Sequence, residues 1–445
     1  MKLAPLLRSV ALVTAVALLP ATTAGLAQVD GKAAPEFGKL FAVYQRIKAS
    51  YVDPVDDDVL IKGAIDGMLS SLDPHSSYLD GESLKKLETL IDGNYEGLGV
   101  SVTMDDGAVK VISPMKGSPA DKAGIKAGDF ITHIDGKLIY GKSLDDAVSE
   151  MRGPAGSAIR LTIFRSGREE PFDVSVTRGV IELEPVTHEL KDGGIGYISV
   201  NEFSKDVGKD VFEAVADLRK SANGRLNGLV LDLRKNPGGS LNEAVALSDL
   251  FLTKGQIVSQ RGRLKQENLT FNSETVFRGE IAAKVPMIVL IDVGSASASE
   301  IVAGALQDQH RALVMGERSF GKGSVQTLMP LTKDSALKLT TARYYTPSGR
   351  SVQEGGIAPD IRVPQLSDPD AAKRAKFALR ESDLKKHLVN EVDLDDQQLE
   401  DDKQVDPRFQ KTPEELKTAG IDDFQLYYAL ATLRHTTSSA MALNR

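Results

Sequence analysis

A strand, a turn of small residues and a helix follow one another between positions 285 and 306, and this run constrains the fold most. Its first part, Val285–Asp292, is a short apolar stretch rich in β-branched residues, which predicts a buried strand. The chain then passes through Gly294-Ser295-Ala296-Ser297-Ala298-Ser299 and resumes as an apolar helical pattern from Glu300 to Leu306. Because a sharp turn of this kind holds a side chain beside the free N–H groups of the helix start, a serine here is a candidate nucleophile.

A candidate base follows at Lys322, 25 residues after Ser297 and just beyond a second buried-looking strand at 312–316. A serine hydroxyl needs a base, and lysine can serve if burial removes its proton at working pH. A solvated lysine has a pKa of about 10.4, and desolvation can lower that value by up to about 3–5 units. The two residues are therefore a candidate serine–lysine dyad.

The preceding segment indicates an α/β sheet. Apolar stretches at 196–200 and 228–233 predict strands that bracket a helix at 211–218, which is typical of a βαβ unit. The second strand leads into the turn Asn236-Pro237-Gly238-Gly239 and a helix at 241–247. Active sites in open α/β sheets gather at the carboxyl ends of the strands. We therefore expect the Gly239 turn, the Ser297 turn and the residues before Lys322 to converge.

The remaining segments differ in pattern. Residues 33–93 have apolar positions at helical spacing, with a turn at Tyr51-Val52-Asp53-Pro54, and Asp73-Pro74-His75-Ser76 ends the second helix. We expect His75 to be structural. Residues 94–177 show short strands separated by glycine turns, whereas 365–445 is charged, with a solvated acidic stretch from 391 to 403 and a closing helix at 424–430. No chemistry is expected in this last region.

Composition and the N-terminus restrict the setting. The 445 residues suggest two or three domains, and the net charge of −8 argues against a nucleic-acid partner. Lys2 and Arg8 precede an apolar stretch at 10–19 and small residues up to Ala27, which predicts a secretory signal peptide, with an uncleaved membrane anchor as the alternative. There are no cysteines, so disulfides and lipid attachment at a cysteine are excluded. We expect an exported protein of a bacterial cell envelope.

Four sequence elements together resemble the carboxy-terminal processing peptidases of the serine–lysine type. Three of them are the runs 232–239, 295–301 and 320–326, and the fourth is the segment upstream, which is similar to a bacterial PDZ domain in its Gly-Leu-Gly-Val entry and its Ser-Pro-Ala…Ala-Gly-Ile…Gly-Asp run. The resemblance extends from about Phe37 to Pro364. It implies a periplasmic serine endopeptidase that cuts near the C-terminal ends of proteins.

The resemblance also implies roles for individual residues. Ser297 would be the nucleophile and Lys322 the base. Gln326 would orient the lysine amine, Glu300 would be a secondary polar partner, and the N–H groups of Gly239 and Ala298 would bind the oxyanion. In the PDZ segment, the N–H groups of Leu98, Gly99 and Val100 would receive a peptide carboxylate, and the peptide would add as a strand along the exposed edge.

The expected fold class is a multidomain α/β and β protein, with a ClpP/crotonase-like protease core, an inserted PDZ domain and an N-terminal helical segment. The expected boundaries are 1–27 for the signal peptide, 28–93 for the helical segment, 94–178 for the PDZ domain, 179–365 for the protease core and 366–445 for the charged tail with its closing helix. The expected partners are polypeptides with free, apolar C-termini, and neither a cofactor nor a metal is expected. The resemblance is compatible with peripheral association with the inner membrane, a homo-oligomer or a lipoprotein adaptor.

Alternative interpretations compete with this one. Residues 316–322 approach a phosphate-binding loop, but Gly323 stands where a magnesium-binding Ser or Thr belongs, and 325–328 alternates like a strand. His310 could serve a Ser-His-Asp triad, although it is expected at the far end of the helix that follows Ser297. The serine run could be a packing turn alone. The chain would then be a catalytically inactive scaffold whose PDZ domain binds peptide tails.

Overall fold

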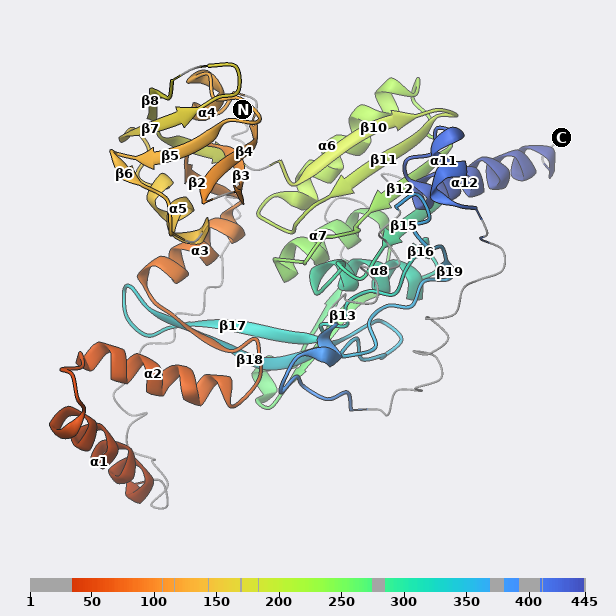
Figure 1. Cartoon of the computed structure of the whole chain (residues 1–445). Coiled ribbons are helices and arrows are strands. Elements are labelled where there is room, and N and C mark those ends of the chain that lie inside the picture. Colours follow the sequence, from red (N-terminus) through yellow and green to blue (C-terminus); the bar gives the residue numbers. More distant parts are fainter. Residues whose placement is uncertain are drawn as a thin grey trace, which may run out of the picture. The chain divides into compact units, whose positions relative to one another are not determined.

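The computed structural model describes residues 34–105, 107–115, 117–142, 144–168, 170–182, 184–273, 285–368, 380–391, 409 and 411–443 (Figure 1). The chain divides into two compact units, Met1–Met68 and Leu69–Arg445. The expected signal peptide lies outside the described residues, as does the expected acidic stretch beyond Glu391. Within the described ranges, no helix is both long enough and apolar enough to cross a membrane.

Two helices at the N-terminus confirm the helical prediction: α1 (Ala34–Ser50) and α2 (Asp57–Ser70). The chain leaves α1 before Pro54, because proline lacks an N–H and disfavours the helical conformation of the residue before it. Lys48 links the two helices across this turn. Its Nζ lies 2.6 Å from the Asp57 carboxylate.

A six-stranded antiparallel sheet forms the segment expected to be a PDZ domain, and the strands predicted there are confirmed. The strand order is β3-β4-β5-β7-β8, with β6 on β5. Along β7, Ile159, Leu161 and Ile163 are fully buried in alternation with more exposed residues, as a sheet with one covered face requires. Its elements are β3 (Val100–Asp105), β4 (Ala108–Pro114), α4 (Pro119–Lys122), β5 (Phe130–Ile134), β6 (Lys137–Leu138), α5 (Leu144–Met151), β7 (Ala158–Phe164) and β8 (Phe172–Thr177).

A two-stranded ribbon joins the ends of this insertion. Strand β2 (Asn94–Gly97) enters it and β9 (Gly179–Glu182) leaves it, and the two pair antiparallel with Gly97 opposite Gly179. Helix α3 (Gly81–Asp92) leads into β2. The two ends of the PDZ segment are therefore adjacent, at the β2–β9 ribbon.

The predicted α/β sheet has six strands in the order β10-β11-β12-β15-β16-β19. All neighbouring pairs are parallel except β10 with β11. Helices α6, α7 and α8 follow strands β11, β12 and β15. The elements are β10 (Val186–Lys191), β11 (Ile195–Val200), α6 (Val207–Ser221), β12 (Gly228–Asp232), α7 (Leu241–Phe251), β15 (Met287–Ile291), α8 (Ala298–Asp308), β16 (Leu313–Gly316) and β19 (Ile361–Arg362).

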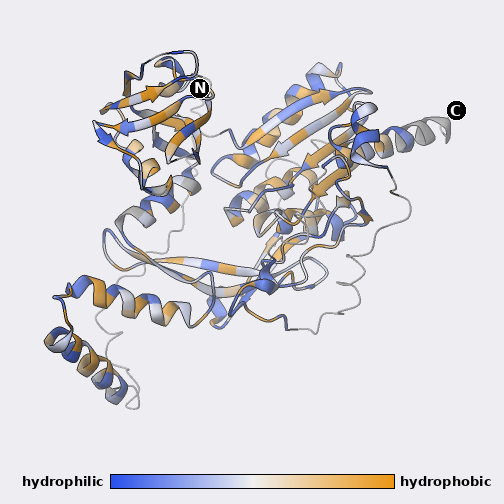
Figure 2. Cartoon of the chain, viewed as in Figure 1, coloured by the Kyte–Doolittle hydropathy of each residue, from blue (hydrophilic) through white to orange (hydrophobic). Residues whose placement is uncertain are grey.

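Both faces of this sheet are covered, as the continuous apolar runs of its strands require. In β12, Leu229 and Leu231 pack in one core with residues of α6, α7 and α8. Val230, between them, packs in a second core with Leu433 of α12 (Phe424–Leu443), and Leu416 of α11 (Pro413–Thr418) joins that core. Figure 2 shows the hydrophobic colour gathered on the central strands. The closing helix predicted at 424–430 is confirmed, and it is a layer of the core.

A second sheet was not predicted from the sequence. Its order is β1-β18-β13-β14, with β17 also paired to β18. Strand β17 begins two residues after Lys322 and continues into the long hairpin with β18. Its strands are β1 (Ser77–Leu79), β13 (Gln256–Gly262), β14 (Leu269–Asn272), β17 (Ser324–Pro330) and β18 (Ala336–Tyr345), and two short 3-10 helices, η2 (Lys265–Glu267) and η3 (Glu381–Asp383), lie outside the sheets.

Candidate active site

Three loops meet at the carboxyl edge of the α/β sheet. Strands β12, β15 and β16 are neighbours in register, with Asp232 opposite Leu290 and Ile291 opposite Gly316. The loops that follow these strands contain Gly239, Ser297 and Lys322 respectively. Parallel strands present their carboxyl ends on one side, so the candidate nucleophile, the candidate base and free backbone donors reach the same edge.

Ser297 occupies a backbone conformation that few side chains adopt. It is the N-cap residue of α8, with φ +54° and ψ −112°. Residues with positive φ cost of order 1–3 kcal/mol and persist only where the surroundings fix them. The neighbouring serines supply that restraint: the Ser295 hydroxyl donates to the Leu233 carbonyl at 2.8 Å, and the Ser299 hydroxyl donates to the Asn236 carbonyl at 2.9 Å.

The glycine pair after β12 lies directly against this turn. At Gly238, with φ +101°, a Cβ would lie 2.7 Å from the Ser297 Cβ. At Gly239, with φ +143°, a Cβ would lie 2.4 Å from the Phe203 carbonyl oxygen. No other residue type fits at either position without displacing backbone or Ser297. The pair therefore serves close packing as well as turn geometry.

Two backbone donors at this edge are available to a ligand. Ala298 is the first residue of α8, so its N–H has no acceptor within the helix. In the described part of the chain, the Gly239 N–H also has no backbone acceptor. These are the two donors that the sequence resemblance assigns to the oxyanion.

Glu300 binds the nucleophile turn and the lysine loop at once. Its side chain is fully buried. One carboxylate oxygen accepts from the N–H groups of Ser297 at 2.7 Å and Lys322 at 3.0 Å. The other accepts from the Gly321 N–H at 2.7 Å and the Ser319 hydroxyl at 2.6 Å. Complete burial raises the pKa of Glu300 to about 7, and the four donors oppose that rise because they favour the ionised form.

The Lys322 side chain is mostly buried. Burial is the main cause that lowers the pKa of Lys322, and the positive charge of Lys338 adds to it. The carboxylates of Glu381, Glu300 and Asp73 act in the opposite direction. Among the described residues, no hydrogen bond or ion pair to the Lys322 Nζ is found.

Tyr344 provides a second connection between the two candidate residues. This buried side chain extends from β18, and its hydroxyl donates to the Ser297 carbonyl at 3.2 Å and also contacts the Lys322 carbonyl. Burial keeps the pKa of Tyr344 well above its usual value, so the hydroxyl remains a donor. No sequence pattern pointed to this residue, because β18 belongs to the sheet that was not predicted.

Gln326 lies on β17 near Lys322 but has other partners. Its Nε2 donates to the Ser324 hydroxyl at 3.0 Å and to the Thr340 hydroxyl at 3.2 Å. Thr340 in turn donates to the Asp73 carboxylate at 3.2 Å. No hydrogen bond from Gln326 to Lys322 is found among the described residues, so the orienting role remains a prediction.

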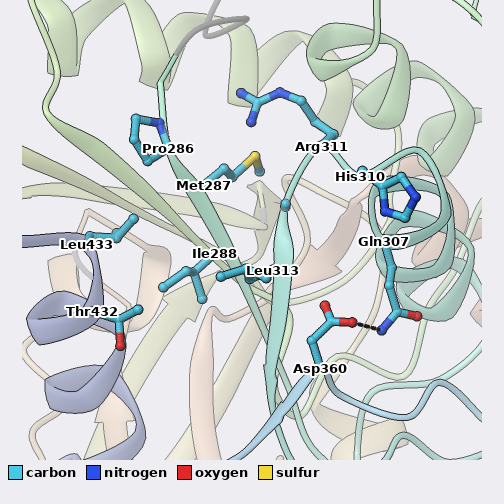
Figure 3. Close-up of a pocket in the computed structure, with 11 residues that line it drawn as sticks. Pro286, Met287, Ile288, Gln307, His310, Arg311, Leu313, Asp360, Thr432 and Leu433 are labelled. Carbon is cyan, nitrogen blue, oxygen red and sulfur yellow. Dashed lines mark hydrogen bonds between the residues drawn. The ribbon is translucent and has the colours of Figure 1, made fainter. Parts of the chain in front are cut away.

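The full length of helix α8 separates His310 from Ser297. It follows α8, at the opposite end of that helix from Ser297, and has φ +52°. Figure 3 shows it beside a pocket with Met287 and Leu313, the first residues of β15 and β16. It therefore lies at the amino edge of the sheet, which is why the alternative triad fails. Residues 324–330 form a strand, not a helix, which removes the phosphate-loop alternative.

The expected peptide site of the PDZ segment has an open strand edge. In the described part of the chain, β3 pairs with β4 alone. Just before β3, Gly99 has φ +69°, and its carbonyl accepts from the Ser118 hydroxyl at 2.9 Å. The N–H groups of Leu98 and Gly99 meet no backbone acceptor among the described residues. The geometry is compatible with the expected binding of a peptide carboxylate by Leu98, Gly99 and Val100.

Three stretches of the chain match known families. Residues 194–363 match peptidase family S41, residues 110–165 match the PDZ domain, and residues 20–83 match the N-terminal domain of the activating protease CtpB.

Individual proteins agree with these matches. A carboxy-terminal-processing protease of Bartonella bacilliformis is 45% identical over 354 residues, which are 79% of this chain and 80% of that protein. The carboxy-terminal processing protease CtpA of Bacillus subtilis is 37% identical over 341 residues, 76% of this chain and 70% of that protein. Among solved structures, a photosystem II D1 C-terminal processing protease has 28% identity and a TM-score of 0.46, over 80% of this chain and 94% of that one.

Proposed function

Because the chain belongs to peptidase family S41, among the PDZ-containing carboxy-terminal processing proteases, we propose that Ser297 and Lys322 are its catalytic dyad. The chain is a serine-type peptidase. The observation that supports the dyad is the Glu300 carboxylate, one oxygen of which accepts from the N–H groups of both Ser297 and Lys322. This arrangement keeps the two backbones next to each other at the carboxyl edge of the sheet.

The proposed reaction needs an uncharged Lys322 amine. Burial favours that form, since it lowers the pKa of Lys322. The neutral amine takes the proton of the Ser297 hydroxyl while the serine oxygen attacks the scissile carbonyl carbon. The resulting oxyanion accepts hydrogen bonds from the Ala298 and Gly239 N–H groups. The Lys322 ammonium then protonates the leaving amine, and a water molecule hydrolyses the acyl-enzyme by the same proton route.

The PDZ segment is proposed to select the substrate by its C-terminal tail. Two features of the described residues support this role: the outer edge of β3 has no strand partner, and the N–H groups of Leu98 and Gly99 have no backbone acceptor. A peptide would extend the sheet by main-chain hydrogen bonds, and its terminal carboxylate would bind the N–H groups. Under this proposal, a peptide with an amidated C-terminus binds more weakly than the same peptide with a free apolar C-terminus.

The proposed location is the bacterial periplasm. The support is the N-terminal sequence, with basic residues, an apolar stretch and small residues up to Ala27. Cell fractionation and N-terminal sequencing of the mature chain test this proposal. A protein recovered from the cytoplasm with residues 1–27 intact would contradict it. Peripheral membrane association is a further proposal, which the same fractionation tests. A homo-oligomer and a lipoprotein adaptor are also proposed, and size-exclusion chromatography and co-purification test them.

The dyad is tested with purified mature protein and a peptide that has a free apolar C-terminus. Ser297→Ala should abolish cleavage yet retain peptide binding, and Lys322→Ala should abolish cleavage equally, because the members of a dyad act as a unit. Lys333→Ala is the matched control, since that lysine is exposed in the turn between β17 and β18, and it should cleave like wild type. Turnover by Ser297→Ala equal to that of wild type would instead support the scaffold alternative.

A further inference from the structure

Glu381 is a buried carboxylate beside the Lys322 loop, and no sequence pattern predicts a role for it. It begins the short helix η3 in the C-terminal region, and its side chain has no exposed surface. Its backbone N–H donates to the Phe320 carbonyl at 3.3 Å, two residues before Lys322. A carboxylate is rarely buried completely without a specific partner, so its surroundings show what it does.

A chain of hydrogen bonds runs from Glu381 to the residue after Lys322. The Gly323 N–H donates to the Gln353 Oε1 at 3.0 Å, and the Gln353 Nε2 donates to the Glu381 Oε1 at 3.0 Å. On the other side, the Nε2 of His75 lies 2.8 Å from the Glu381 Oε2. The Gln353 amide is therefore hydrogen-bonded to both groups, so the position of the Glu381 carboxylate restrains the lysine loop.

The same carboxylate carries a charge that acts on the lysine. Burial opposes the charged form, but hydrogen bonds from His75 and Gln353 outweigh it and lower the pKa of Glu381. Glu381 is therefore ionised, and its negative charge favours the ammonium form of Lys322.

On the basis of the proposed serine–lysine mechanism, we propose that Glu381 is a positioning residue for the catalytic base: it fixes the Lys322 loop through Gln353 and presents a negative charge to the Lys322 amine. The sequence places this residue 59 positions after Lys322, in a different segment of the chain. Several elements contribute other titratable groups that face Glu381 or Lys322. These groups are Lys338 and Tyr344 of β18, Glu300 of α8, Asp73 and His75 before β1, and His387 after η3.

The test compares the pH dependence of kcat/KM in variants that separate shape from charge. Glu381→Gln keeps the shape and removes the charge, which favours the neutral amine of Lys322. The rising limb of the profile should therefore move to lower pH. The plateau should fall by roughly 10- to 100-fold, because the hydrogen bonds from His75 and Gln353 that hold the loop lose a charged acceptor. Glu381→Asp keeps the charge but shortens the link to Gln353, so its plateau should fall while its rising limb stays close to that of wild type.

Glu391→Gln is the matched control. Glu391 lies ten residues further along, is about half exposed, and accepts from the Tyr345 hydroxyl at 2.7 Å. Its profile should coincide with that of wild type. A Glu381→Gln profile with a lower plateau and an unmoved limb would overturn the proposal, because a purely structural residue would give that result.

A further variant keeps the proposal testable if Glu381→Gln does not fold. Gln353→Leu interrupts the link but leaves both charges, so the plateau should fall without movement of the limb; a plateau equal to that of wild type would overturn the positioning role. The mechanism itself is checked separately. If Ser297→Ala and Lys322→Ala cleave like wild type, the dyad fails; if both are inactive and Glu381→Gln matches wild type, only the present inference fails.

Discussion

Replacing Glu300 by glutamine perturbs the group that connects the two candidate catalytic residues. The amide presents one oxygen and one NH₂ group where the carboxylate presents two oxygens. If the NH₂ group faces Ser297 and Lys322, two buried N–H donors lose their acceptor. If it faces Gly321 and Ser319, only the Gly321 N–H loses one, because a serine hydroxyl can turn and accept. The second orientation is therefore expected.

The expected loss follows from these contacts. One unsatisfied buried donor costs about 1–3 kcal/mol, and the remaining bonds weaken because they are no longer charge-assisted. Removal of a buried charge offsets part of this loss, since burial raises the pKa of Glu300 to about 7. We expect the free energy of unfolding to fall by about 1–3 kcal/mol. A loss of about 1.4 kcal/mol in the positioning of Ser297 and Lys322 lowers kcat/KM about tenfold.

Urea unfolding followed by far-UV circular dichroism measures the stability, and cleavage of a peptide measures kcat/KM. Glu213→Gln is the control, because this glutamate is exposed on α6 and its one ion pair among the described residues is with Lys209, at 3.7 Å. A surface pair of this kind contributes about 0.3–0.5 kcal/mol. A Glu300→Gln protein as stable and as active as the Glu213→Gln control would refute the reasoning.

Three other changes have defined outcomes. Gly238→Ala would bring a Cβ within 2.7 Å of the Ser297 Cβ and should lower kcat about 10²-fold, because it displaces the candidate nucleophile. Gly224→Ala is its control: it has a similar positive φ of +90° but open space around it, and it should leave kcat unchanged. Gly99 has φ +69°, and a Cβ there would lie 2.4 Å from the side chain of Ser118, which caps α4. Gly99→Val should therefore weaken tail-peptide binding at least about tenfold in a titration, and equal affinity contradicts the PDZ site. Because burial lowers the pKa of Lys322, kcat/KM should rise with pH below the usual lysine value of about 10.4; a decrease over that range contradicts a lysine base.

The sequence predicted the local elements of the candidate site. The β-branched run before Ser297 forms β15, and the apolar pattern after it forms α8. The glycine turn after β12 was also predicted, and parallel pairing brings these loops to one edge of the sheet. Such features follow from hydrophobic periodicity and turn residues, and a single short segment contains all the information needed to predict them.

The residues that support the site were not predicted. Tyr344 contacts the backbones of both Ser297 and Lys322, but it depends on the register of β18 in a sheet whose strands come from distant parts of the chain. His75 and Glu381 are 306 positions apart and lie 2.8 Å from each other. The sequence around His75 and around Glu381 contains no motif from which their contact could be predicted. The backbone conformation of Ser297, with positive φ, is likewise imposed by neighbouring loops.

The sequence by itself determined the strand and helix on either side of Ser297, the glycine turn after β12, and which side chains are candidates for chemistry, because those properties depend on neighbours within a turn or two. The tertiary structure alone decided the environment of that chemistry. It buried Glu300 between two loops, desolvated Lys322, and placed Glu381 from the C-terminal region beside it. Burial and charge at a point in space are sums over residues from every part of the chain, and no local pattern contains them.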